Sequence, residues 1–134
     1  MKRLEVFHQR CLRRILKIRW QQHVKNADVL EKAQVTSLEV MVASMRLRWY
    51  GHVVRMPEDR LPKVLLDTKP NYGKRTRGRP RKSWMSCIKE DAANFLETPD
   101  IELDAVREMA QDRTHWREMI RHKRNFVGAG HSND

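Results

Sequence analysis

The sequence predicts an all-α fold, arranged as a small helical bundle in two halves joined by a basic, extended linker. Three observations predict it. Apolar residues recur at steps of three and four, the period of an amphipathic helix. Alternation with a period of two, typical of strands, does not persist beyond a few residues. Residues 69–82 contain no aliphatic side chain and no carboxylate, so this segment cannot bury itself. We therefore expect helical halves at 1–68 and 83–125, a linker at 69–82 and a disordered tail at 126–134.

The first half begins with a basic amphipathic helix, predicted over residues 2–18. Its apolar stripe consists of Leu4, Phe7, Cys11, Ile15 and Ile18, and cations occupy most of the remaining positions.

The next two helices of the first half are marked by capping residues. Asn26 is a suitable N-cap for a short one. The run Thr36–Glu39 fits a capping box, which predicts the start of a long amphipathic helix. Gly51 is the weak point of this helix, and Pro57 must end it, because proline lacks the backbone donor that a helix interior needs.

Capping residues and prolines also place the later helices. Pro62 is tolerated in the first turn of a short helix. Ser83 and Asp112 have side chains that can accept hydrogen bonds from free amides at a helix start, so each predicts one. A further helix is expected around 103–110.

The charge of the chain predicts a polyanionic partner. Of 134 residues, 28 are Lys or Arg and 17 are Asp or Glu, which gives a formal net charge of +11. DNA or RNA is the expected partner, because binding of cations releases the counterions condensed on its phosphates. No stretch approaches the roughly 18 apolar residues of a membrane span, so no membrane partner is expected.

The clearest predicted contact is the basic arm, residues Lys74–Lys82. Its core, 77–81 (RGRPR), matches an AT-hook, in which an extended backbone enters the minor groove and arginines follow the groove floor. A nuclear localisation signal or a solvated linker has the same composition, and we expect the protein in the nucleus, with the cytoplasm as an alternative. The predicted contacts in the arm are Lys74, Arg75, Arg77, Gly78, Arg79, Pro80, Arg81 and Lys82.

Two further basic surfaces are predicted on helices. Arg10, Arg13 and Arg14 can follow a phosphate backbone, although a solvated face, a membrane surface or a helix-binding partner would show the same pattern. In 45–52 cations alternate with aromatic residues, as in proteins that stack single-stranded bases. There, the helical spacing favours Trp49 as a core residue and leaves Arg46, Arg48 and Tyr50 as contacts.

Catalysis and metal binding have weak support in the sequence. Glu58 and Asp67 resemble the separated carboxylates of metal-dependent nucleases, but they lie in a turn and a short helix rather than on strands. His8 and Cys11 form one close pair, whereas a structural zinc site usually needs two. We expect no enzyme activity, no metal and no cofactor.

Four segments of the chain resemble a known family. They are 4–20 (with FHQRCLRRILKIRW at 7–20), 46–57 (RLRWYGHVVRMP), 78–84 (GRPRKSW) and 110–117 (AQDRTHWR). In this order they resemble the C-terminal region of non-LTR (LINE-type, RTE-like) retrotransposon endonuclease–reverse transcriptases. The resemblance implies a region downstream of the polymerase that grips template RNA or target DNA. Because the chain contains neither the endonuclease nor the polymerase core, a reverse transcriptase core is an expected partner. A protein-interaction module that docks on such a core or on a host factor is the alternative function.

Overall fold

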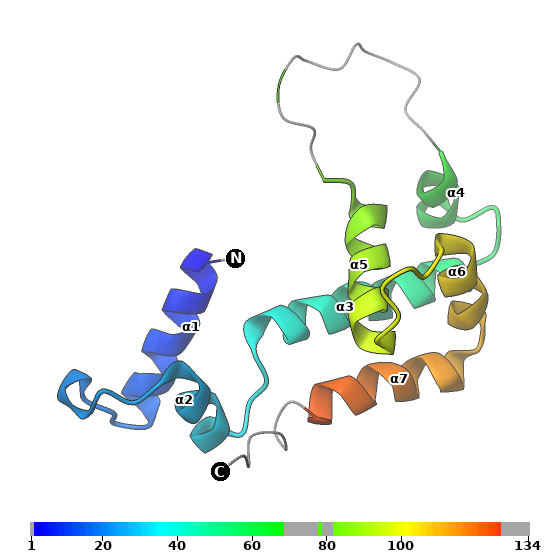
Figure 1. Cartoon of the computed structure of the whole chain (residues 1–134). Coiled ribbons are helices and arrows are strands. Elements are labelled where there is room, and N and C mark those ends of the chain that lie inside the picture. The colour runs from blue at the N-terminus through cyan, green and yellow to red at the C-terminus, as the bar shows by residue number, and fades with distance from the viewer. Residues whose placement is uncertain (1, 69–77, 79–81, 127–134) are drawn as a thin grey trace. The chain divides into compact units, whose positions relative to one another are not determined.

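The computed structural model describes residues 2–68, 78 and 82–126, and among them it contains helices and no strand (Figure 1). The predicted all-α class is confirmed for this part of the chain. The helices are α1 (Lys2–Ile15), the 3-10 helix η1 (Trp20–Gln22), α2 (Asn26–Ala33), α3 (Leu38–Val54), α4 (Leu61–Asp67), α5 (Trp84–Leu96), α6 (Leu103–Gln111) and α7 (Arg113–Phe126).

Three predicted helix starts are confirmed, two of them by side-chain caps. Pro62 lies in the first turn of α4. The Ser83 side chain accepts a hydrogen bond from the Ser86 amide at 3.1 Å and caps α5. The Asp112 carboxylate accepts from the amides of Thr114 and His115, at 2.9 and 3.1 Å, and caps α7. At α5 and α7 the Ser83 and Asp112 side chains satisfy amides that have no partner inside the helix.

Other predicted boundaries were wrong. The first helix ends at Ile15 rather than residue 18, and Lys17 adopts a φ of 55°, which a continuing right-handed helix excludes. Asn26 is the first residue of α2, not its cap, and its side chain accepts a hydrogen bond from Arg13 instead. Helix α3 ends at Val54, three residues before Pro57, where the buried Lys63 ammonium donates a hydrogen bond to the Val54 carbonyl.

The chain forms two compact units. The first consists of residues 1–44 and 121–134, and the second of residues 45–120. This division differs from the predicted halves at 1–68 and 83–125, because most of α3 and all of α4 group with α5 and α6. The predicted linker at 69–82 and the predicted tail lie largely outside the described residues.

The second unit is built around a packed core. Its largest buried side chains are Trp116 of α7, Tyr50 and Leu47 of α3, and Ile88 of α5. The Trp116 indole nitrogen donates a hydrogen bond of 2.9 Å to the Leu47 carbonyl, which satisfies the polar atom of a fully buried ring.

Gly51 allows the close approach of α3 and α7. A Cβ placed at residue 51 would lie 2.4 Å from the Trp116 indole nitrogen, a distance that packed atoms do not tolerate. The glycine predicted as a weak point in the helix is therefore the position at which the Trp116 ring rests.

The predicted orientation of α3 was wrong in this unit. Trp49 was expected in the core and Tyr50 at the surface, but Trp49 is 52% exposed and Tyr50 is 1% exposed. Apolar residues lie on all sides of α3, so periodicity alone does not determine which side is buried. Trp116 determines it, because this ring packs where Gly51 leaves room.

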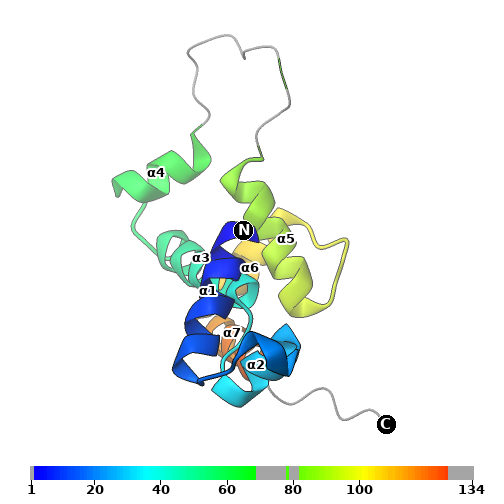
Figure 2. The same cartoon turned by 90° about the vertical axis from the view of Figure 1, so that its left-hand side faces the viewer.

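In the first unit α1 packs against α2, and the two helices lie side by side in both views (Figure 1 and Figure 2). Val29 of α2 is fully buried. The apolar stripe of α1 is largely exposed, by 57% at Leu4, 63% at Phe7 and 74% at Ile15. The stripe that the sequence predicts is therefore an apolar surface of α1 and not a buried seam.

Among the described residues, no helix has both the length and the apolar character that crossing a membrane requires.

Candidate nucleic-acid interface

Most of the basic arm lies outside the described residues. This applies to the predicted contacts Lys74, Arg75, Arg77, Arg79, Pro80 and Arg81. Gly78 is exposed and has a φ of 150°, a conformation that glycine adopts readily and other residues rarely do. The exposed Lys82 ammonium pairs with the Glu90 carboxylate, and this hydrogen bond raises the pKa of Lys82.

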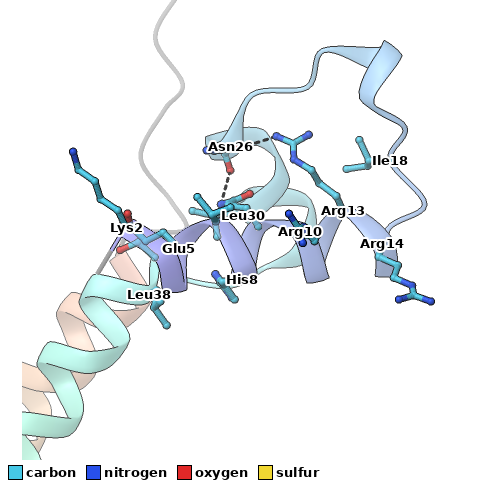
Figure 3. Close-up of a pocket in the computed structure, with 13 residues that line it drawn as sticks. Lys2, Glu5, His8, Arg10, Arg13, Arg14, Ile18, Asn26, Leu30 and Leu38 are labelled. Atoms are coloured by element: carbon cyan, nitrogen blue, oxygen red, sulfur yellow. Dashed lines mark hydrogen bonds between the residues drawn. The ribbon is translucent and has the colours of Figure 1, made fainter.

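The first unit carries a basic hollow between α1 and α2, with a volume of about 940 Å³ (Figure 3). Four cations and one carboxylate line it, together with polar and apolar side chains. We call it the α1–α2 hollow. Its lining residues are Lys2, Glu5, Val6, His8, Gln9, Arg10, Arg13, Arg14, Ile18, Asn26, Leu30, Ser37 and Leu38.

The three predicted arginines of α1 differ in their surroundings. Arg13 reaches across to α2, where one guanidinium nitrogen donates to the Val24 carbonyl at 2.7 Å and to the Asn26 side chain at 2.8 Å (Figure 3). Arg10 and Arg14 are exposed, and Arg14 points away from α2. Arg13 therefore holds α1 and α2 together, while Arg10 and Arg14 remain accessible to a phosphate.

In the second unit, Arg46 is occupied by an internal ion pair. Its guanidinium binds both oxygens of the Asp91 carboxylate on α5, at 2.6 and 2.8 Å, and Asp91 is 7% exposed. The hydrogen bond to Asp91 raises the pKa of Arg46. Because a guanidinium fork matches a carboxylate so well, this arrangement favours a role for Arg46 in joining α3 to α5.

The side of α3 that faces away from its buried residues contains Met45, Arg48, Trp49 and His52, and the half-buried Arg55 follows directly after the helix ends at Val54. The steps of three and four between the first four residues place them on one side of the helix. Met45 is 64% exposed, and the side chains of Arg48 and His52 are also exposed. The Trp49 and His52 rings lie 5.5 Å apart, inclined at 49°. An indole ring is thus presented to solvent beside cations on a helix whose other side is buried.

Arg55 extends this face toward the start of α7. Its guanidinium donates a hydrogen bond to the Ala110 carbonyl. Burial lowers the pKa of Arg55, and the positive charges of Arg113 and Arg117 lower it further. Within the described part of the chain, Arg48, Arg113 and Arg117 form no ion pair. Asp112, the carboxylate next to Arg113, caps α7.

We call Arg48, Trp49, His52, Arg55, Arg113 and Arg117 the α3–α7 cluster. The sequence predicted only Arg48 of this cluster as a contact. The spacing of Arg48, His52 and Arg55, and of Arg113 and Arg117, places each set on one helical face and would have indicated two basic stripes. That the stripes meet depends on the packing of Trp116 against Gly51, which the sequence pattern does not reveal.

The carboxylates considered for nuclease chemistry are engaged in ion pairs. Both oxygens of Asp67 accept hydrogen bonds of 2.6 Å from Arg107, and Glu58 lies 3.4 Å from the Lys63 ammonium. In the described ranges, no three His, Cys, Asp or Glu side chains are arranged to hold a metal ion.

No protein-family model, curated protein or solved structure matches the chain. The retrotransposon resemblance therefore stays a prediction from the sequence.

Proposed function

We propose that this chain is a non-catalytic nucleic-acid-binding module. The observation that carries the proposal is the α3–α7 cluster, in which Arg55 lies near Arg113 and Arg117 of α7, and the exposed Trp49 lies on α3 with Arg48 and His52. Repulsion between Arg55, Arg113 and Arg117 disfavours their proximity, and a bound polyanion would relieve it.

The proposed contact surface lies on helices that are packed in the core of the second unit. Trp49 lies on the helix that contributes Leu47, Tyr50 and Val54 to the core, and Arg55 is the first residue after that helix. Arg113 and Arg117 flank Trp116, whose indole is hydrogen-bonded to the same helix. Side chains on packed helices lose less conformational freedom on binding than those on loops, which favours affinity.

The partner in this proposal is DNA or RNA, as the resemblance to retrotransposon polymerase tails also implies. The basic arm and the exposed Arg10 and Arg14 of α1 would add further phosphate contacts. The overall charge of +11 is in keeping with binding through several surfaces.

The test is a salt titration of the full chain with fluorescently labelled nucleic acid. The triple variant Arg48→Ala, Arg113→Ala, Arg117→Ala removes exposed, unpaired cations from the α3–α7 cluster and should fold normally. Its affinity should fall by at least roughly tenfold, and the slope of log affinity against log salt should become shallower by about two for a single strand.

A charge-matched control separates the local surface from the net charge. The triple variant Lys25→Ala, Lys32→Ala, Arg60→Ala removes the same charge from exposed positions outside the cluster and the α1–α2 hollow. It should lose much less affinity. Equal losses in the two variants would show that the α3–α7 cluster has no special role. A wild-type chain that binds no nucleic acid would overturn the proposal itself.

The exposed stripe of α1 favours a second candidate function, docking on a reverse transcriptase core. Leu4, Phe7 and Ile15 are each more than half exposed, and the resemblance implies this partner. After nuclease treatment, the wild-type chain should co-precipitate with such a core and the Phe7→Asp variant should not. Equal recovery of the two chains would count against docking through α1.

A further inference from the structure

The α3–α7 cluster carries an inference about the form of nucleic acid that binds there, and it rests on the function proposed above. We infer that the cluster takes a single-stranded segment, with an unpaired base stacked on Trp49 and the adjacent phosphates held by the arginines. The distinguishing feature is an exposed indole on a helix face that also carries Arg48 and His52, not the positive charge alone.

Trp49 has no role in the core that would explain it. The indole is 52% exposed, whereas Tyr50 and Trp116 are each 1% exposed. Its ring neighbour is His52, at 5.5 Å and 49°, one turn further along the same exposed face. A large aromatic surface in water is unfavourable, and a stacked base would remove it from water.

The surrounding charges fit the backbone of the same strand. Arg48 lies on α3 and Arg55 one residue past its C-terminal end, and His52 lies between them along the chain. Arg113 and Arg117 continue the positive surface from Arg55. A strand of a few nucleotides that follows α3 would therefore pass cations on one side while a base reaches the indole.

The geometry favours a single strand over a duplex. In a duplex both faces of each base are covered by neighbouring base pairs, so a tryptophan on a helix surface has no free base face to contact. In a single strand the bases can turn outward and stack on aromatic side chains. Phosphate contacts alone would not distinguish the two forms, because both carry the same groups.

The test compares two variants that differ in their ability to stack. Trp49→Phe keeps an aromatic ring, whereas Trp49→Leu keeps an apolar side chain without one. The probes are a labelled oligothymidylate and a blunt duplex of the same length, each titrated with the full chain at one salt concentration. Met45→Ala, which removes a 64% exposed apolar side chain from the same face, is the control.

Trp49→Leu should weaken binding of the oligothymidylate by roughly 5- to 150-fold, the range that loss of one stacked base produces. Its affinity for the duplex should change by less than about twofold. Trp49→Phe should retain most of the single-strand affinity, and Met45→Ala should match the wild type. Circular dichroism should show unchanged helix content, because Trp49 contributes little to the core.

Three outcomes would overturn the inference while leaving nucleic-acid binding in place. They are unchanged binding of the oligothymidylate by Trp49→Leu, an equal loss for strand and duplex, and an equal loss in the Phe and Leu variants. Absence of binding of both probes by the wild-type chain would instead overturn the proposed function, and the inference with it.

Discussion

The two compact units of the protein differ in what they bury. All but two of the buried apolar side chains that the structure describes belong to the second unit, and the exceptions are Val29 and Ala43. The first unit leaves the stripe of α1 exposed and joins α1 to α2 through Arg13. Both units carry cations, but only those of the second unit lie on helices that a packed core holds in place. The difference teaches that the packing beneath a cation, and not its charge alone, decides whether it belongs to a preorganised binding surface.

The largest expected difference between the units concerns their tryptophans. Trp116 is 1% exposed and Trp20 is 77% exposed. Trp116→Ala should lower the free energy of unfolding by about 3–5 kcal/mol, because it leaves a cavity in the core. Trp20→Ala should change it by less than about 0.5 kcal/mol. Urea denaturation followed by circular dichroism measures both. Similar losses in the two variants would contradict the comparison.

Gly51→Ala tests the contact on which the second unit depends. At a solvent-exposed helix position, this change stabilises by roughly 1 kcal/mol. Here the new Cβ would lie 2.4 Å from the Trp116 indole nitrogen, so we expect a destabilisation of about 1–3 kcal/mol. A decrease in the unfolding free energy would therefore support the contact between residue 51 and Trp116, and an increase would contradict it.

A double-mutant cycle locates the cause of the Gly51→Ala effect. In a Trp116→Phe background the indole nitrogen is absent, and the loss caused by the alanine should become smaller. An undiminished loss would mean that the alanine acts on something other than Trp116.

Two arginines that join helices allow a smaller test. Arg46 binds the buried Asp91 in the second unit, whereas Arg13 binds an exposed side chain and a carbonyl in the first. Arg46→Ala leaves a carboxylate without its partner, and should lower the unfolding free energy by about 1–2 kcal/mol, since the guanidinium is itself one-third exposed. Arg13→Ala should lower it by about 0.5–1 kcal/mol. Thermal unfolding of both variants ranks them, and a larger loss for Arg13→Ala would reverse the expected order.

The sequence predicted well what depends on neighbouring residues and poorly what depends on distant ones. Ser83 and Asp112 mark helix starts because capping involves only the next few amides. Pro62 marks one because its ring fits the first turn, where the backbone donor it lacks is not needed. The prediction of which side of α3 is buried was wrong, because apolar residues surround this helix. The position of Trp116, far along the chain, determines which of them are buried.

In the candidate site, too, the sequence predicted local features but not those that depend on distant residues. Arg48 was predicted because it lies in a local alternation of cations and aromatic residues. Arg113 and Arg117 were missed as contacts because their relation to Arg55 is created by tertiary packing. Arg46 has the same charge as Arg48 and lies two residues before it, yet only its pairing with Asp91 reveals that it is already engaged.

The last and smallest expected effect is a loss of folding stability at high pH, caused by ionisation of Tyr50 in the core of the second unit. Burial raises the pKa of Tyr50 above its ordinary value of about 10, so the folded state holds the phenolic proton more tightly than the unfolded state. The resulting stabilisation is complete below about pH 10 and is lost as the pH rises through the raised pKa.

The Tyr50→Phe variant has no phenol to ionise at this position. Above about pH 10 it should lose less stability than the wild type, and below about pH 10 the stability of both chains should depend on pH in the same way. Denaturation curves across this range compare the two chains. Parallel loss of stability in both would mean that the phenol ionises as freely as in the unfolded chain, and the core would then be looser than the 1% exposure of Tyr50 implies.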